Sequence, residues 1–478
     1  MMDPLWTLQE MVKATGGQCV ADGEVYGVSI DSRTVRSGDV FLALKGEHLD
    51  GHTYVQQAFA KGAVAAIISD PVDIGSEALI TVEDTNAALV ALGQQARDRT
   101  AAQIVGVTGS VGKTGTKEAL NAALARSGAT HASERSYNND IGVPLTLARM
   151  PAATQYGVLE MGMNHSGELR ALTAQARPDI AAITNVEAVH AEFFSSTDDI
   201  ADAKAEIFEG MSSTGTAILN IDNPYFNHLV NSARDVGLSN ILSFGEAEGA
   251  DIRLLKHFEA DDCSTVHADI AGELMTYRIG VPGVHWVKNS LAVLACVHAL
   301  GADLGYAGLA LGEMVAPKGR GRRHSVSFRD GAVLVVDESY NASPVSMRAA
   351  ISDLGQAKGT LPDSGISGRK IAVLGDMLEL GEGSVAQHQA LASPLQDAGV
   401  DLVFTVGTAM TALDDALEIF RRGGHAASAS DLVPALVDQL QPGDVVMLKG
   451  SNAMGLGSVV DALVALDDDG FSRRAAVG

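Results

Sequence analysis

The sequence predicts an α/β protein of three domains, with a phosphate-binding loop and a mostly parallel sheet in the central domain. The chain has 478 residues, which at roughly 150 residues per domain suggests about three domains. A glycine-rich turn at residues 106–114 follows a strand-like run and precedes a helical one. It lies late enough in the chain for a folded unit to precede it. Apolar runs then alternate with helical patterns to the C-terminal region, as in open α/β sheets.

Residues 1–100 are expected to form a small α/β domain. Short apolar runs typical of strands alternate there with helical patterns. The strand-like runs are residues 28–33, 39–44, 63–69 and 78–82, and the helical patterns are residues 53–62 and 86–98.

The stretch GVTGSVGKT, residues 106–114, predicts a nucleotide triphosphate site. Glycines let backbone N–H groups approach an anion, and the N-terminus of the following helix adds its positive dipole end. A lysine in this position reaches the β and γ phosphates, and the hydroxyl after it binds Mg²⁺. The strict loop pattern has glycine where this chain has Val107. The residues expected to contact ATP here are Gly109, Ser110, Val111, Gly112, Lys113 and Thr114.

Residues 101–318 are expected to form the central domain around a mostly parallel sheet, because apolar runs at 156–162, 180–186 and 215–222 are separated by helical patterns. Three chemically reactive residues lie in this region: Glu160 in the first run, His190 shortly after the second, and Lys204 on the helical stretch 198–210. Taken singly, they fit a solvated carboxylate, a capping histidine and a surface lysine. Following a phosphate loop, they instead suggest that a carboxylate and an imidazole complete the Mg²⁺ coordination that Thr114 begins.

Residues 319–478 are expected to form a second doubly wound, Rossmann-like domain. The segment PKGRGRRH, residues 317–324, looks like a linker or domain edge. Each apolar run beyond it ends in glycine or an acid and is followed by a helical pattern, so a site is expected at the carboxyl ends of the strands. These runs are residues 332–339, 370–376, 401–407 and 444–450.

Composition limits the partners and the compartment. The net charge of −25 and the lack of a basic stripe argue against a nucleic-acid partner. Cys19, Cys263 and Cys296 lie far apart, which predicts neither a disulfide framework nor a zinc site and fits a reducing cytoplasm. The N-terminal segment lacks the features of a signal peptide. The apolar stretch 290–315 is interrupted by polar residues and predicts buried helices, so no membrane insertion is expected.

The motifs together resemble the Mur ligases, ATP-dependent amide-forming enzymes of bacterial peptidoglycan precursor synthesis. The shortened loop TGSVGKT is similar to the family's phosphate loop and accounts for Val107. The other matching segments follow in the family's order: YNNDIGVPLTL (137–147), LEMG (159–162), TNVEAVHAEFF (184–194), AKAEIF (203–208), GVHWVKNSLAVLA (283–295), DESYNASP (337–344), GDMLELGE (375–382) and KGSNAMGL (449–456).

The resemblance implies roles for particular residues. Lys113, Glu160, His190 and Lys204 would be catalytic, and two Mg²⁺ ions would be held by Thr114, Glu160, His190 and a Lys204 carbamylated by CO₂. Further ATP contacts would come from Asn289, from Arg320 or Arg322, and from Asp337. The spacing leaves open which arginine matches.

Within the family, the segments favour the ligase that joins D-Ala-D-Ala to UDP-MurNAc-tripeptide in the cytoplasm, expected to be a monomer. Residues 29–52 resemble its uridine-diphosphate segment, with contacts expected from Ser29, Asp31, Ser32, Arg33 and Asn139. DESYNASP resembles its DDSYNANP element, which implies acceptor contacts from Tyr340, Asn341 and Ser343. This chain departs from the family's pattern at Glu338, where the second aspartate is usual, and at Asn452, where an arginine is common.

Three alternatives remain to be weighed. A ligase that adds a single diamino acid to UDP-MurNAc-dipeptide is the main rival, but its Asp-Asn-Pro-Arg signature is absent from the C-terminal domain. A phosphate-loop kinase or switch ATPase would need neither the Lys204 segment nor the uridine-like one. A non-catalytic regulator should have lost one or more of the four catalytic residues, and all four are present. The sequence leaves open whether the third residue of the tripeptide is diaminopimelate or lysine.

Overall fold

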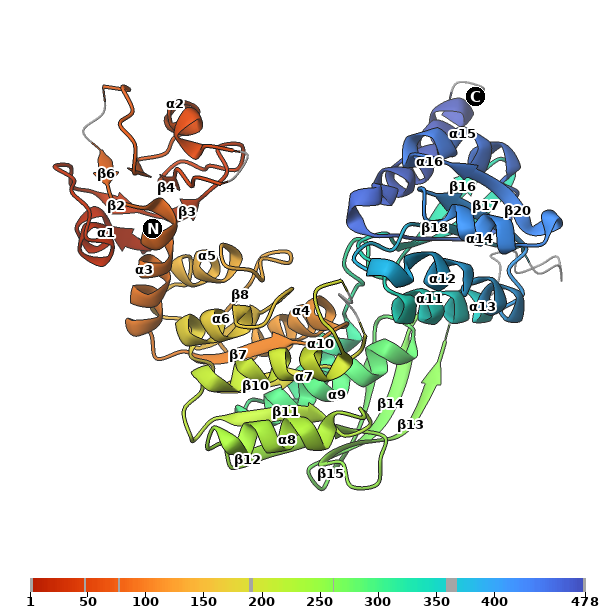
Figure 1. The fold of residues 1–478 in the computed structure, drawn as a ribbon, viewed down its shortest axis with the longest axis horizontal. Coiled ribbons are helices and arrows are strands. Elements are labelled where there is room, and N and C mark those ends of the chain that lie inside the picture. The colour runs from red at the N-terminus through yellow and green to blue at the C-terminus, as the bar shows by residue number, and fades with distance from the viewer. Residues whose placement is uncertain are drawn as a thin grey trace.

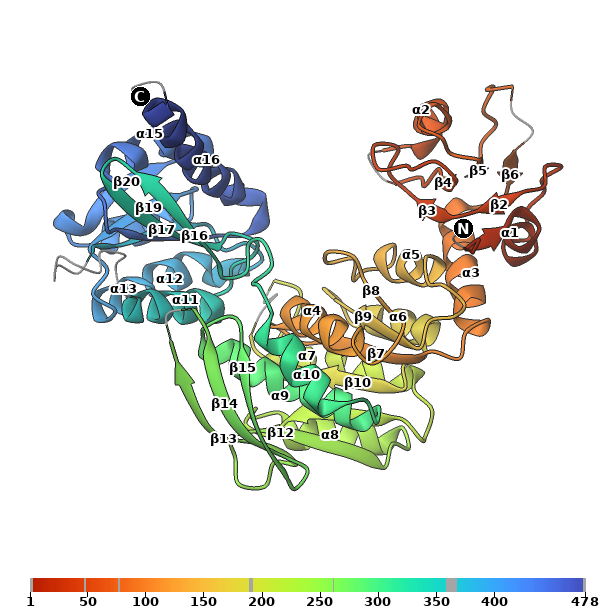
Figure 2. The same cartoon turned by 180° about the vertical axis from the view of Figure 1, so that it is seen from behind.

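The computed structural model describes residues 3–46, 49–75, 78–188, 192–260, 262–357 and 368–475. Within these ranges the strands form four sheets, of two, nine, six and four strands. Figures 1 and 2 show an N-terminal and a C-terminal domain standing apart on opposite sides of a central domain that contacts both. The domain limits proposed from the sequence, after residues 100 and 318, fall between the sheets. Every helix within the described ranges is too short or too polar to cross a membrane.

The N-terminal domain is built on a four-stranded, all-parallel sheet of order β3-β4-β5-β6. Its elements are β1 (Trp6–Thr7), α1 (Leu8–Thr15), β2 (Glu24–Val25), β3 (Gly27–Ser29), β4 (Asp39–Leu42), the 3-10 helix η1 (Gly51–Tyr54), α2 (Val55–Ala60), β5 (Ala65–Ile68), β6 (Leu79–Thr81) and α3 (Thr85–Asp98). Strands β3 to β6 overlap the apolar runs expected from the sequence, whereas the short antiparallel pair β1 and β2 was not expected.

The central domain contains a nine-stranded mixed sheet of order β15-β14-β13-β12-β11-β10-β7-β9-β8. Its elements are β7 (Gln103–Thr108), α4 (Lys113–Leu124), β8 (Thr130–Ala132), α5 (Gly142–Ala148), β9 (Tyr156–Glu160), α6 (Glu168–Ala176), β10 (Ile180–Ile183), α7 (Thr197–Ala205), the 3-10 helix η2 (Glu206–Gly210), β11 (Thr216–Asn220), α8 (Phe226–Asp235), β12 (Asn240–Gly245), β13 (Ile252–Glu259), β14 (Ser264–Ile270), β15 (Glu273–Ile279), α9 (Val284–Ala299) and α10 (Leu304–Gly312).

Helices cover both faces of this sheet, which explains why its parallel strands are apolar throughout. One core packs α4, α9 and α10 against residues such as Val105 and Val107 of β7. The other packs α5 to α8 against the opposite face, which includes Ile104. Strands β7 to β12 are parallel, whereas β13, β14 and β15 form antiparallel pairs at one edge. This antiparallel extension was not expected from the sequence.

Strand β7 lies between β9 and β10, and all three are parallel. The chain leaves β7 toward β8 and β9 on one side and returns to β10 on the other. Such a change of direction makes a crevice at the carboxyl ends of the strands, where open α/β sheets bind ligands. The phosphate loop, Glu160 and the segment after β10 all lie at this edge.

The C-terminal domain has a six-stranded sheet of order β16-β17-β21-β18-β19-β20, with helices on both faces. Its elements are β16 (Arg322–Phe328), β17 (Gly331–Glu338), α11 (Pro344–Gln356), β18 (Lys370–Gly375), the 3-10 helix η3 (Gly381–Gly383), α12 (Ser384–Gln389), α13 (Ala392–Asp397), β19 (Leu402–Val406), α14 (Thr411–Ala416), the 3-10 helix η4 (Ile419–Arg421), β20 (Arg422–Ala426), α15 (Ala429–Gln439), β21 (Val445–Lys449), the 3-10 helix η5 (Asn452–Met454) and α16 (Leu456–Ala475).

The segment expected to be a linker, 317–324, has two parts. Residues 317–321 form a turn, and β16 begins at Arg322 and pairs antiparallel with β17. The connection between the central and C-terminal domains is therefore short. Met314 and Ala316 still belong to a central-domain core, whereas Lys318 donates to Asp461 of α16 at 2.7 Å.

Candidate active site

The phosphate loop connects β7 to α4, and its glycines adopt conformations that side chains disfavour. Gly112 precedes the helix with φ of 87° and Gly109 has φ of 144°. A Cβ atom on Gly109 would lie 2.0 Å from Thr184 Oγ1, so the loop has no room for a side chain there. The segment after β10 fixes the loop, because the Asn185 carbonyl accepts from Ser110 N at 3.0 Å and its Oδ1 accepts from Val111 N at 3.1 Å.

Lys113 begins α4 and folds back over the loop, where its Nζ donates to the Gly109 carbonyl at 2.6 Å. Burial lowers the pKa of Lys113, the carboxylate of Glu160 opposes this shift, and the charge of Arg320 reinforces it. Thr114 is buried, with its Oγ1 3.3 Å from Ser136 Oγ. The loop therefore offers a cation and a hydroxyl from adjacent helix positions.

Glu160 ends β9 beside the loop and is only 1% exposed. Its Oε1 accepts from Asn138 Nδ2 at 2.9 Å, and its backbone N–H donates to Ser133 Oγ at 3.2 Å. Its Oε2 is buried without a hydrogen-bond partner. A buried carboxylate oxygen without a partner costs free energy, so it is a natural ligand for a cation.

Lys204 lies in the last turn of α7 and is 2% exposed. Burial, and secondarily the positive charge of Lys113, hold the pKa of Lys204 well below its ordinary value. The half-buried Lys113 therefore interacts electrostatically with both Glu160 and the buried Lys204, although α7 is far from the phosphate loop in sequence. His190, expected beside them, lies outside the described residues.

Asn289 of α9 faces the phosphate loop, since a Cβ atom on Gly112 would lie 2.9 Å from its Oδ1. Its neighbour Trp286 packs against α4, where a Cβ on Gly115 would lie 2.9 Å from the indole ring. The position of Asn289 agrees with the ATP contact expected for it, which itself stays a prediction.

The structure distinguishes the two arginines that are candidates for the ATP contact, Arg320 and Arg322, by their contacts and exposure. The Arg320 Nη2 lies 3.4 Å from Ser136 Oγ, and its guanidinium carbon lies 4.1 Å from the centre of the Tyr340 ring. Arg320 therefore reaches the central domain from the turn that opens the C-terminal domain. Arg322 is exposed at the start of β16. Of the two arginines, Arg320 is therefore the one positioned for the expected phosphate contact, which stays a prediction.

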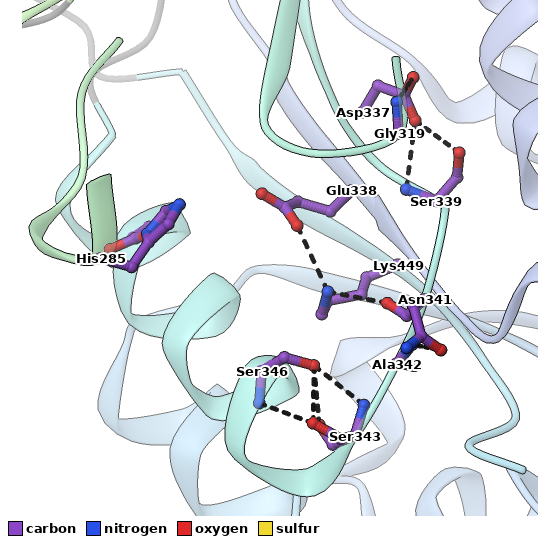
Figure 3. A network of polar contacts seen from close by, with 11 residues as sticks. His285, Gly319, Asp337, Glu338, Ser339, Asn341, Ala342, Ser343, Ser346 and Lys449 are labelled. Carbon is purple, nitrogen blue, oxygen red and sulfur yellow. Dashed lines mark hydrogen bonds and ion pairs between the residues drawn. The ribbon is translucent and has the colours of Figure 1, made fainter. Parts of the chain in front are cut away.

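Asp337 is fully buried at the end of β17, where it holds the turn that carries Arg320 (Figure 3). Its Oδ2 accepts from Gly319 N at 2.7 Å, and its Oδ1 accepts from the Ser339 hydroxyl at 2.5 Å. Both carboxylate oxygens thus have partners within the domain. The ATP contact expected of Asp337 stays a prediction, and the structure shows a second role for it.

The three expected acceptor residues follow Asp337 along one loop. Tyr340 stacks on Arg320. The Asn341 carbonyl accepts from Lys449 Nζ at 2.9 Å, and the same ammonium lies 3.3 Å from Glu338 Oε2 (Figure 3). Ser343 caps α11 and exchanges hydrogen bonds with Ser346, which is a structural role. Asn341 therefore lies at the Lys449 ammonium and Tyr340 at the Arg320 guanidinium, whereas the Ser343 hydroxyl is already engaged.

The residues expected to bind the uridine diphosphate lie at the carboxyl end of β3 and before α5. Ser29 and Ser32 are buried, and Ser32 Oγ donates to Gln57 Oε1 at 2.8 Å. Arg33 has a side chain that is 83% exposed and pairs with Asp31 at 2.8 Å. Asn139 is exposed, and its Oδ1 accepts from Gly142 N at 2.9 Å. Arg33 is therefore available to a ligand, whereas the two serine hydroxyls have internal partners.

Sequence reasoning missed several polar residues of this site. Asn138 was visible inside YNNDIGVPLTL but was not singled out. Thr184 and Asn185 begin the TNVEAVH segment, and their position after a strand was the available signal. No sequence signal pointed to Ser136 or Lys117, because a serine in a loop and a lysine in a helix are most often solvated.

Comparison with known proteins identifies the class. Three family models match in chain order: "Mur ligase family, catalytic domain" at residues 24–107, "Mur ligase middle domain" at 107–297, and "Mur ligase, glutamate ligase domain" at 321–452. The chain belongs to the Mur ligase family.

Within that family the similarity is to one kind of member. The UDP-N-acetylmuramoyl-tripeptide–D-alanyl-D-alanine ligase of Rickettsia prowazekii is 32% identical over 458 residues, 96% of this chain and 99% of that protein. The crystal structure of MurF from Acinetobacter baumannii has a TM-score of 0.83 and 31% identity, covering 97% of this chain and 99% of that one. MurF from Thermotoga maritima, in complex with ADP, has a TM-score of 0.75 and 26% identity, covering 93% and 98%.

Proposed function

We propose that this protein is an ATP-dependent ligase that joins D-Ala-D-Ala to UDP-MurNAc-tripeptide. The terminal carboxylate of the tripeptide attacks the γ-phosphoryl group of ATP, so ADP leaves and an acyl phosphate forms. The amine of D-Ala-D-Ala then attacks the acyl carbon, loses a proton and displaces inorganic phosphate. The products are UDP-MurNAc-pentapeptide, ADP and phosphate. The end-to-end match to UDP-N-acetylmuramoyl-tripeptide–D-alanyl-D-alanine ligases, with the phosphate loop and Glu160 in place, supports this assignment over a ligase for single diamino acids.

The protein's own charges suit phosphoryl transfer. The loop N–H groups and the start of α4 would receive the phosphates, with Lys113 on their outer side. Arg320, whose charge acts on Lys113, would add a second cation as negative charge shifts between oxygens. Preorganised cations in a buried site stabilise such a transition state strongly.

The residues present fit the two Mg²⁺ ions that the family uses. Glu160 supplies a buried oxygen without a partner, and Thr114 supplies a hydroxyl, both of which suit a hard cation. When bound, Mg²⁺ would neutralise negative charge on the phosphates. We assign Glu160, Thr114, His190 and Lys204 as its holders.

Lys204 would serve that site as a carbamate. An ammonium there would place a second positive charge beside Lys113 and would repel a divalent cation by several kcal/mol at 4 Å, with an effective dielectric constant of about 20. Its neutral amine can add to CO₂ with loss of one proton, which replaces a cation by an anionic oxygen ligand. The burial of Lys204 beside Lys113 supports this modification, because it disfavours the protonated form.

The remaining substrate contacts that we propose come from all three domains. We propose that Arg33 and its neighbours bind the uridine diphosphate, that Asn289 contacts the adenine, and that Tyr340 and Asn341 face the dipeptide. Because these pockets lie on different domains, closure should precede chemistry and exclude water from the acyl phosphate. We place the enzyme in the cytoplasm as a monomer, and its three free cysteines support a reducing compartment.

Phosphate release with defined acceptors tests the assignment. Turnover is expected with UDP-MurNAc-tripeptide plus D-Ala-D-Ala, and little with single diamino acids. The Lys113→Ala variant controls for contaminating phosphatases. Robust release with UDP-MurNAc-dipeptide plus diaminopimelate, and none with D-Ala-D-Ala, would overturn the proposal.

A further inference from the structure

Lys117 is a buried cation for which the proposed chemistry has no use. It lies on α4 one turn after Lys113 and is 0% exposed. Its Nζ donates to two backbone carbonyls, Ser133 O at 2.8 Å and Arg135 O at 3.0 Å, and pairs with the carboxylate of Glu118. Burying an ammonium is costly unless it is fully paired. Its two carbonyl partners both lie in the segment of residues 133–138, between β8 and α5.

The 133–138 segment reaches three groups of the nucleotide site. Ser133 Oγ accepts from the backbone N–H of Glu160 at 3.2 Å, and Asn138 Nδ2 donates to its carboxylate at 2.9 Å. Ser136 Oγ lies 3.3 Å from Thr114 Oγ1 and 3.4 Å from Arg320 Nη2. The segment therefore orients the carboxylate, the hydroxyl and the arginine that the proposed reaction uses.

Backbone strain in this segment shows that it needs an external support. Arg135 has φ of 50°, in the left-handed region that residues other than glycine rarely adopt. Such a conformation costs of order 1–3 kcal/mol and persists only where surrounding contacts impose it. The carbonyl of this strained residue is one of the two that Lys117 holds.

We propose that Lys117 is a positioning residue of the nucleotide site, which holds the 133–138 segment in the shape that presents Ser136 and Asn138 to Thr114 and Glu160. The inference rests on the proposed ligase function for its effect on turnover. It predicts in addition that nucleotide affinity depends on Lys117, which can be measured without any acceptor.

The test compares Lys117→Met with a matched control. Lys117→Met removes the ammonium and keeps a stem of similar length. Displacing catalytic groups by about 1 Å can cost about 100-fold in rate, so we expect kcat/KM for ATP to fall about 100-fold and MgADP binding, measured by calorimetry, to weaken. Lys370→Met is the control, because Lys370 also donates to a backbone carbonyl but lies on β18 in the C-terminal domain. Its kinetics should match the wild type.

Two further variants separate positioning from general stability. If Lys117 acts through the segment, Lys117→Met and Ser136→Ala should be clearly non-additive in kcat/KM. Arg135→Gly, which removes the strain, should restore part of the activity lost in Lys117→Met. Lys117→Gln, which keeps one amide donor, replaces Lys117→Met if the latter does not fold. Unchanged MgADP binding in the folded Lys117 variant, or strictly additive effects, would overturn the proposal. A wild type that binds MgADP but does not ligate D-Ala-D-Ala would instead overturn the proposed function.

Discussion

Arg320 offers the sharpest test of the site. Its contacts with protein groups set an upper limit on the free energy that it can contribute to domain closure, so a larger effect on turnover must come from contact with the substrate. Both side chains are half-buried, so stacking of Arg320 on Tyr340 at 4.1 Å contributes about 0.5–1 kcal/mol. The 3.4 Å contact with Ser136 is at the long end of hydrogen-bond lengths and adds less than ~1 kcal/mol. Loss of about 2 kcal/mol in domain closure would lower the rate about 30-fold.

A direct contact between Arg320 and the transferring phosphoryl group would have a larger effect on the rate than these contacts with protein groups. Removing one preorganised charge or donor from a transition state costs about 100- to 1,000-fold in kcat. We therefore expect Arg320→Ala to lower kcat by about 100- to 1,000-fold, with a smaller change in KM for ATP. Arg320→Lys should recover only part, since an ammonium neither stacks nor donates as a planar fork.

The assay is steady-state phosphate release with UDP-MurNAc-tripeptide and D-Ala-D-Ala. Arg322→Ala is the matched control, because Arg322 is two residues away and exposed. It should stay within about twofold of the wild type, as surface substitutions usually do. A fall of 30-fold or less in Arg320→Ala would limit this residue to holding the domains together. A larger loss in Arg322→Ala than in Arg320→Ala would reverse the assignment.

Three further predictions concern Lys113, Lys204 and His131. Lys113→Ala should abolish ligation and leave binding of the UDP substrate largely intact by calorimetry; equal loss of both would mean that Lys113 is structural. Lys204→Arg should be folded and nearly inactive, and the wild type should lose activity in CO₂-depleted buffer and regain it with bicarbonate; an active arginine variant would exclude the carbamate. Burial lowers the pKa of His131. As the pH falls from 7 to 5, His131 is therefore protonated more readily in the unfolded chain than in the folded one, and the free energy of unfolding should decrease. His131→Gln should flatten the fall in Tm over that range, and parallel curves for the two proteins would contradict the shift.

The sequence was informative where local chemistry dictates structure. Glycines at 109 and 112 require a special backbone, so the phosphate loop could be located from spacing alone. Alternation of apolar runs and helical patterns predicted three α/β units. The antiparallel strands β13 to β15 were missed because they carry polar and charged residues, which give a weaker strand signal than buried parallel strands.

Roles that depend on tertiary contacts could not be predicted from the sequence. Lys117 resembles a surface lysine on a helix, and only the fold buries it against the 133–138 segment. The ligand contacts expected of Asp337 and Ser343 stay predictions, and nothing in the sequence indicated that these residues also hold a turn and cap a helix. Spacing could not distinguish Arg320 from Arg322, because the direction of each side chain is set by where the turn ends and β16 begins.

The turn that carries Arg320 bears on how members of this family could be recombined. Gly319 N–H donates to Asp337, Tyr340 N–H donates to the Gly319 carbonyl at 3.1 Å, and Lys318 pairs with α16. Arg320 therefore belongs structurally to the C-terminal domain, although we propose that it contacts the nucleotide. A chimera that exchanges acceptor domains should be joined at Pro317, between the last central-core residue and Lys318. A junction only five residues later would pair the arginine of one parent with the tyrosine and aspartate of the other.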